Sequence, residues 1–338
     1  MITHRYRTVD VGVAGGSLRV GVWDPIDVAE GAAVPSALLV HGITSSHLAW
    51  PLVVEQLPGT RIIAPDLRGR GASHDVAGPA GMRAHAADLV AVLDAFEVER
   101  LPVVGHSMGG FVAVVLAHLA PERVSRLELL DGGLPLDAPP GLSPEQLVAA
   151  VLGPTAERLA MRFEHVAAYL DFWRAHPAFA GGIDPAIEAC FAYDLVPAGE
   201  LLRPATSLQT TTDDSMDLNG GDAIVEALEA LEALEALEAL EALAALAAPA
   251  GSAAPAAPTA SAAPTARDRR VPPVRFVTVP RGLRDETPGL YAPDYLARML
   301  PGFPAVEHVA LEGLNHYTLV MGRAGAAELG ALLRPVLA

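Results

Sequence analysis

The sequence contains no lysine. All 23 basic residues are arginine, against 40 acidic residues, and the formal net charge is −17 at pH 7. No basic stripe stands out along the chain, whereas proteins that bind nucleic acid usually gather positive charge on one face. Residues 222–248 alone hold one aspartate and six glutamates without an arginine, so one segment supplies much of the excess charge. We therefore expect no nucleic-acid partner.

Cysteine and long apolar runs are scarce as well. The single cysteine, Cys190, excludes an intrachain disulfide and suits a reducing compartment. No uninterrupted apolar stretch reaches the ~18 residues that a membrane-spanning helix needs. The basic residues near the start are not followed by the apolar segment of a secretory signal. These absences predict a cytoplasmic protein without a membrane span.

Apolar residues are abundant, at 51% of the sequence, and are enough for a sizeable core. Over residues 1–131, short apolar segments typical of buried strands alternate with helical patterns. The strand signals lie at residues 37–41, 61–65, 101–105 and 127–130, and the helical patterns at 82–96 and 108–119. This alternation predicts an α/β fold with a mostly parallel, twisted sheet flanked by helices, and with the loops after the strands along one edge.

Residues 132–221 interrupt this alternation. They show mostly helical patterns with proline and glycine breaks and no strong strand signal. Strand signals return at residues 274–279 and 306–311, and a final helical pattern follows. We expect a helical lid at 132–221, inserted after the sixth strand of a core that comprises residues 1–131 and 271–338.

Residues 222–270 have low complexity. Leucine recurs at every third residue from Leu228 to Leu246, among alanine and glutamate. Three residues turn a helix by about 300°, so successive leucines shift by about 60° and leave no fixed apolar stripe and no heptad. Residues 249–270 are rich in alanine, proline and serine. We expect a flexible surface insert whose removal from Glu226 to Thr265 preserves activity; the alternative is a partner-binding helix.

The segment Gly105-His106-Ser107-Met108-Gly109 lies between a strand signal and a helical pattern. This G-x-S-x-G arrangement is typical of a sharp strand-to-helix turn that forces its serine into a strained backbone conformation. Glycines two residues before and two after the serine let neighbouring backbone approach. The turn would present Ser107 at the sheet edge as a nucleophile, and the Met108 N–H at the helix N-terminus would stabilise negative charge.

A serine nucleophile needs a base, an acid behind it and a second oxyanion donor. His316 follows the last strand signal and is the predicted base; His106, beside the serine, points away in such a turn. Asp285 is the first choice of acid, Asp131 is its rival, and Glu286 would substitute if the loop were shifted. The second N–H donor is assigned to Ile43, after Gly42, and Thr44 or Ser45 could add a hydroxyl.

Aromatic residues of the predicted lid offer an apolar acyl pocket, although aromatics at helical spacing more often serve packing. They are Phe163, Tyr169, Phe172, Trp173 and Phe179, and Trp50 after the oxyanion loop is equally ambiguous. His41 and His47 lie in a turn without a carboxylate or cysteine cage. We therefore expect no metal and no cofactor.

Five motifs appear in a recognisable order: VHGITSSHLAW, APDLRGRGAS, VVGHSMGG, GLRDETP and GLNHYTLVM. In order and spacing they resemble those of the α/β-hydrolase superfamily, and the chain resembles its lidded esterase and C–C hydrolase branch. The resemblance implies Ser107 as nucleophile, His316 as general base and then acid, and Asp285 as the residue that orients the imidazole. The segment 222–270 departs from the family pattern.

Serine at position 107 also excludes two reactions of this fold, because its haloalkane dehalogenases and epoxide hydrolases carry aspartate at that position. The expected function is a serine hydrolase that cleaves a small or medium carboxylic ester, thioester or lactone through an acyl-enzyme. Its substrate is expected to be a largely apolar small molecule. The alternatives are a C–C hydrolase for diketones, a cofactor-free perhydrolase, and a non-catalytic small-molecule-binding protein on the same scaffold.

Overall fold

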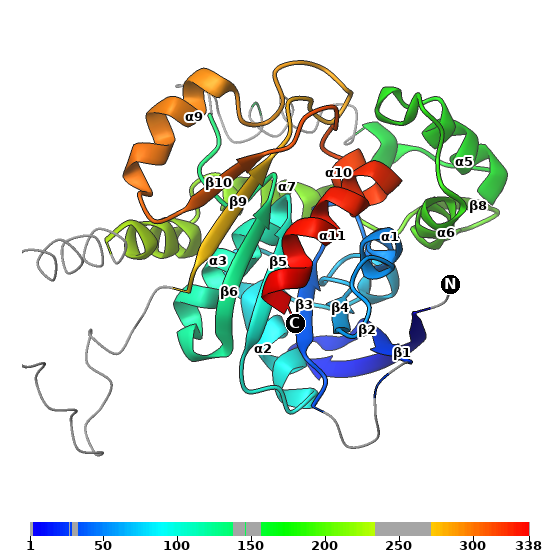
Figure 1. Ribbon diagram of the computed structural model, residues 1–338. Helices are drawn as coiled ribbons and strands as arrows, with labels where there is room; N and C mark the ends of the chain where they lie inside the picture. The colour runs from blue at the N-terminus through cyan, green and yellow to red at the C-terminus, as the bar shows by residue number, and fades with distance from the viewer. Residues whose placement is uncertain are drawn as a thin grey trace, which may run out of the picture.

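A computed structural model describes residues 3–26, 28, 33–137, 146, 157–233 and 272–337. Within them, one sheet has eight strands in the order β1-β2-β4-β3-β5-β6-β9-β10 (Figure 1). Both contacts of β2 are antiparallel, and all other neighbouring strands are parallel. The strands are β1 (His4–Val13), β2 (Gly16–Pro25), β3 (Ser36–Val40), β4 (Arg61–Pro65), β5 (Leu101–His106), β6 (Val124–Leu130), β9 (Val274–Thr278) and β10 (Glu307–Ala310). The predicted mostly parallel sheet is thus confirmed.

Helices cover the sheet on both faces, and each strand divides its side chains between them. Leu38 and Val40 of β3 join one apolar cluster, whereas Ala37 and Leu39 join the other. Successive side chains of a strand point to opposite faces, so a strand buried on both sides is apolar throughout. The first cluster takes in α2 (Met82–Ala95), α3 (Met108–Leu119) and α9 (Pro293–Met299); the second takes in α1 (Pro51–Val54), α10 (Thr318–Met321) and α11 (Arg323–Leu337).

The segment after β6 contains helices and one short hairpin. The helices are α5 (Val166–Arg174), α6 (Pro185–Tyr193) and α7 (Leu208–Leu218), and the hairpin pairs β7 (Leu195–Ala198) with β8 (Leu201–Pro204). No strand signal marks these two strands in the sequence, because each has only four residues and the first contains Pro197. Gly199 turns the hairpin with a φ of 68°, a conformation that glycine adopts easily. The helical part of the expectation holds, and the role of this segment as a lid stays a prediction.

The beginning of the expected insert is packed. Residues 222–233 are helical, and Ala223, Ile224, Ala227 and Leu231 belong to the same cluster as α2 and α3. These positions recur at helical spacing, so a stripe exists here that includes one of the regularly spaced leucines. The expectation of no fixed stripe concerns the leucine repeat from Leu228 to Leu246, most of which lies outside the described residues, and it stays a prediction. Residues 234–270 of the expected flexible insert lie outside the described residues.

Among the described helices, none combines the length and the apolarity that crossing a bilayer requires.

Replacement of Leu231 should therefore lower stability. Leu231 is 7% exposed, whereas Val225 in the same helix is 41% exposed. Leu231→Ala should lower the free energy of unfolding by about 2 kcal/mol, because it removes buried apolar contacts and leaves a cavity. The control Val225→Ala should change it by less than about 0.5 kcal/mol. Urea unfolding measures both, and an unchanged midpoint for Leu231→Ala would show that this helix does not contribute to the core.

Candidate active site

Ser107 occupies a strained turn between β5 and α3. Its φ of 56° and ψ of −125° are unusual for a residue with a side chain. The backbone around it holds the turn in place: the Ser107 N–H donates to the Leu130 carbonyl at 2.9 Å, and its carbonyl accepts from the Gly110 N–H at 2.9 Å. The serine is therefore tied both to the end of β6 and to the first turn of α3.

Close backbone approach explains the glycines on either side of this serine. A Cβ on Gly105 would lie 2.3 Å from the Gly109 carbonyl oxygen, and a Cβ on Gly109 would lie 2.1 Å from the Val40 carbonyl oxygen. Neither distance is sterically possible without a shift of the backbone. The turn therefore requires glycine at both positions, for the steric reason that the sequence analysis proposed.

His316 is paired with Asp131. Its Nδ1 donates to Asp131 Oδ2 at 2.7 Å, and both side chains are buried. Asp131 directly follows β6 with a φ of 48°, and its N–H donates to the Val277 carbonyl of β9 at 2.7 Å. The rival acid of the sequence analysis thus occupies the position behind the histidine.

The structure contradicts the first choice, Asp285, as the partner of His316. The Asp285 carboxylate instead accepts from Arg281 Nη1 at 3.0 Å and from Asn315 Nδ2 at 2.8 Å. Both oxygens of the Asp285 carboxylate are therefore engaged, one by Arg281 and the other by Asn315, the residue before His316. Glu286 closes its own turn by accepting from the Arg284 N–H at 2.6 Å, so it does not substitute.

Asp285 nevertheless supports the loop that carries the histidine. Arg281 also donates to the Gly313 carbonyl, and the His316 N–H donates to the Arg281 carbonyl at 3.0 Å. Asn315 donates a second hydrogen bond to the Ala178 carbonyl at 2.9 Å. The sequence assigned no role to Arg281, because its partners in the loop of His316 lie more than 30 residues away along the chain.

A single cavity brings the candidate residues together. Ser107, Asp131 and His316 line it, as do Ile43 and Met108, the two predicted oxyanion donors. Gly42 permits the close approach of this loop, because a Cβ there would lie 3.1 Å from the Ser107 Cβ. Within the described residues, neither the Ile43 N–H nor the Met108 N–H donates a hydrogen bond.

The two other buried histidines beside the cavity are held neutral. His41 Nδ1 donates to the Gly42 carbonyl at 2.8 Å, and its Nε2 accepts from the Leu67 N–H at 3.0 Å. Burial lowers the pKa of His41 to about 4. His106 Nε2 donates to the His316 carbonyl at 3.0 Å, and burial followed by the neighbouring charge of His316 lowers the pKa of His106 well below its ordinary value. Both imidazoles therefore serve as neutral hydrogen-bonding groups.

Comparison with known proteins gives the same architecture. Residues 35–180 match a family model described as alpha/beta hydrolase fold. A crystal structure of an E-2-(acetamidomethylene)succinate hydrolase superimposes with a TM-score of 0.67 at 19% identity, covering 99% of this chain and 100% of the other. This chain has the α/β-hydrolase fold. The predicted resemblance to the α/β-hydrolase superfamily is thereby confirmed.

Two curated relatives match part of this α/β-hydrolase-fold chain. Lipase LipV from Mycobacterium tuberculosis (strain ATCC 25618 / H37Rv) is 41% identical over 100 residues, which are 30% of this chain and 38% of the lipase. The 2-hydroxymuconate semialdehyde hydrolase from Pseudomonas sp. (strain CF600) is 41% identical over 105 residues, 30% of this chain and 37% of that protein. The chain thus spans less than two fifths of the length of each.

The segment after β6 supplies much of the wall of the cavity in this α/β-hydrolase fold. Of the five aromatic residues predicted for a pocket, Trp173 lines it, whereas the other four pack in or against the second core cluster, as does Trp50. Two further aromatic residues line the cavity without a signal in the sequence: Phe191, which stacks on Trp173 with ring centroids 4.1 Å apart, and Tyr317. Their cavity positions depend on how the helices pack, and no local pattern marks them.

The neutral state of His41 predicts a loss of stability at low pH. Its folded pKa of about 4 lies below the ordinary value of 6.5, so between these values the unfolded chain binds a proton that the folded chain does not. The contribution of His41 to the free energy of unfolding should have its full value above pH 6.5. It should decrease toward pH 4 by up to about 1.4 kcal/mol per pH unit. Urea unfolding across this range measures the slope, which His41→Gln should make shallower; an equal slope in the variant would contradict the prediction.

Proposed function

We propose that this protein is a serine hydrolase that cleaves carboxylic esters through an acyl-enzyme. The observation that carries the proposal is the buried His316–Asp131 pair, which lines the same cavity as Ser107 on its strained turn. A serine hydroxyl becomes an effective nucleophile when a positioned imidazole takes its proton. Asp131 accepts the Nδ1 proton of His316, which leaves Nε2 as the basic nitrogen of the neutral ring.

The proposed reaction has two halves. Ser107 Oγ attacks the ester carbonyl carbon while His316 Nε2 takes the proton of the Ser107 hydroxyl. The N–H groups of Ile43 and Met108 donate hydrogen bonds to the oxyanion that forms. The C–O bond to the alcohol then breaks, and the alcohol leaves with the proton from His316. Water attacks the acyl-enzyme in the same way and restores Ser107, with the acid as second product. Asp131 stabilises the imidazolium in both halves.

The cavity lining favours an uncharged substrate. Apolar side chains from the segment after β6 and from the core line the cavity. Its polar lining includes Thr44, Ser45 and Ser46 from the loop after β3, and Asp194, Ser215 and Asn219 from the segment after β6. Among the described residues that line it, none is an arginine or lysine that would balance a substrate carboxylate. We infer a neutral, largely apolar acyl group. A cytoplasmic location and the lack of a nucleic-acid partner stay predictions.

Carbon–carbon hydrolysis is the second candidate. The relative named 2-hydroxymuconate semialdehyde hydrolase matches at the same 41% identity as the relative named lipase. Attack by Ser107 on a ketone carbonyl would use the same three side chains, with a carbanion in place of the alkoxide as leaving group. Substrate profiling distinguishes the two reactions.

A panel of p-nitrophenyl esters tests the proposal. The protein should hydrolyse the butyrate ester faster than the succinate monoester of similar size, because the second carries an unbalanced carboxylate. Ser107→Ala should lower kcat by about 10³-fold or more, because it removes the nucleophile. A fluorophosphonate should label Ser107 in the parent. No turnover of esters, thioesters or diketones and no label would contradict the proposal and favour a binding protein.

The two aspartates provide a matched pair of variants. Asp131→Asn should lower kcat by about 10³- to 10⁴-fold, because an amide cannot accept the Nδ1 proton of His316 in the same way. Asp285→Asn should lower kcat by less than about tenfold, because this side chain holds the loop and not the imidazole. Ester kinetics measure both, and the reverse order would return the role of the acid to Asp285.

A further inference from the structure

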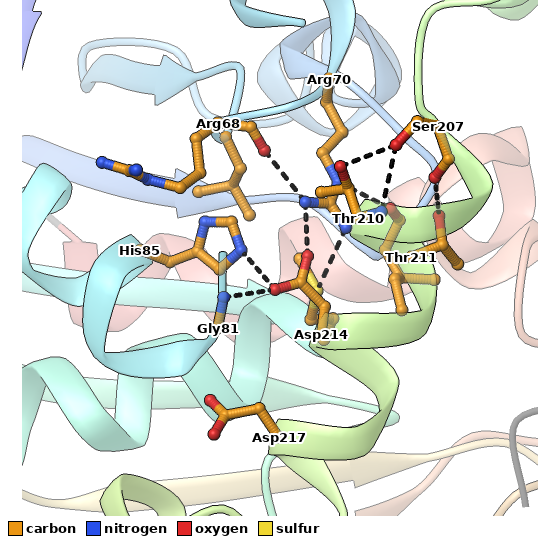
Figure 2. Close-up of polar contacts among 12 residues, drawn as sticks. Arg68, Arg70, Gly81, His85, Ser207, Thr210, Thr211, Asp214 and Asp217 are labelled. Atoms are coloured by element: carbon orange, nitrogen blue, oxygen red, sulfur yellow. Dashed lines mark hydrogen bonds and ion pairs between the residues drawn. The ribbon is translucent and has the colours of Figure 1, made fainter. Parts of the chain in front are cut away.

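Arg70 lies at the centre of a buried polar cluster that no part of the proposed mechanism uses (Figure 2). Its guanidinium and the carboxylate of Asp214 on α7 are both 0% exposed, and Arg70 Nη1 forms an ion pair with Asp214 Oδ2 at 2.5 Å. Asp214 Oδ1 also accepts from the Gly81 N–H at 2.6 Å and from His85 Nε2 at 3.0 Å. Figure 2 shows these contacts converging on Asp214.

The other nitrogens of Arg70 reach the predicted oxyanion donors. Arg70 Nε donates to the Ile43 carbonyl at 2.9 Å, and Nη2 lies 3.8 Å from Met108 Sδ. Nη1 also donates to the Arg68 carbonyl at 2.9 Å. One guanidinium therefore contacts both residues whose N–H groups the proposed mechanism uses.

Arg70 completes the fixation of the loop after β3. The Gly42 carbonyl accepts from His41 Nδ1 at 2.8 Å and from the Ser45 N–H at 3.2 Å. Because a trans peptide is planar, this carbonyl directs the Ile43 N–H to the opposite side. Arg70 holds the next carbonyl, that of Ile43, so two consecutive peptide planes have defined orientations.

The ion pair also connects the loop to the wall of the cavity. Asp214 belongs to α7, and the next residue, Ser215, and Leu218 of the same helix line the cavity. Burial alone would raise the pKa of Asp214, but the positive charge of Arg70, followed by that of His85, holds the pKa below its ordinary value. The carboxylate therefore stays charged at neutral pH.

A second buried arginine nearby has no such connection. Arg68 pairs with Asp88 on α2 through two contacts of 2.7 Å, and both side chains are almost completely buried. The other contacts of the Arg68 guanidinium are with the carbonyls of Ala14, Ala77 and Pro79. Arg68–Asp88 and Arg70–Asp214 are thus two neighbouring buried arginine–aspartate pairs, and the second contacts the loop after β3.

We propose that Arg70 is a positioning residue of the serine hydrolase. It holds Ile43 and Met108 so that their N–H groups are preorganised for the oxyanion, and through Asp214 it fixes α7 relative to them. Preorganised donors stabilise the transition state more than the bound substrate, so the effect falls on kcat. This inference rests on the proposed function.

The variants Arg70→Met and Arg68→Met of the full chain test the positioning role of Arg70. The readouts are ester kinetics, fluorophosphonate labelling and urea unfolding. Both variants should lower the unfolding midpoint, because each leaves a buried aspartate without its partner. Arg70→Met should also lower kcat and the labelling rate by about 100-fold, with KM changed by less than about threefold. Arg68→Met should keep kcat within about threefold of the parent.

A folded Arg70→Met protein with kcat within about threefold of the parent would overturn the inference, as would an equal loss of kcat in Arg68→Met. If Arg70→Met does not fold, Arg70→Lys decides: it keeps a charge near Asp214 but lacks the planar fork that reaches Ile43. A retained kcat in Arg70→Lys overturns the inference, and a loss with an intact fold supports it. A parent that neither turns over nor takes the label would instead remove the proposed function and this inference with it.

Discussion

The strained turn at Ser107 is the constraint around which the rest of the site is arranged. The backbone of three strands and one helix meets there so closely that a Cβ on Gly105, Gly109 or Gly132 would overlap a carbonyl. Close packing of main chain removes the freedom that a turn would otherwise have. The strain at Ser107 is therefore maintained by many contacts and does not relax through one local change.

Sheet order places the other candidate groups around this turn. β5 lies between β3 and β6, and β9 lies beyond β6. Because these strands are parallel, their carboxyl ends share one edge, and the loops with Ile43, Ser107 and Asp131 follow directly from it. A mostly apolar cavity lies at that edge, and the buried histidine–aspartate pair lines it.

The buried polar groups around the cavity have different hydrogen-bonding roles. His41 and His106 are neutral and donate to backbone carbonyls, Asp285 holds the loop of His316, and Asp131 accepts the hydrogen bond from His316 Nδ1. Burial is the largest cause that disfavours the charged form of the two imidazoles. This division leaves one imidazole in the cavity with a carboxylate behind it.

The sequence by itself determined the features that depend on neighbours along the chain. The alternation of apolar strands and helices predicted the sheet, and the glycines around Ser107 predicted the turn, because both patterns reflect local backbone geometry. The order of motifs also singled out His316 and the Ile43 loop.

Only the tertiary structure decided between the carboxylates. Asp131 and Asp285 both follow parallel strands that end at the same edge, and the choice depends on Arg281 and Asn315 taking the second of them. The packing of residues 222–233, the cavity positions of Phe191 and Tyr317, and the contact of Arg70 with Ile43 depend likewise on segments distant in sequence. Folding brings these residues close to their partners, and the spacing along the chain does not indicate which distant residues will be in contact.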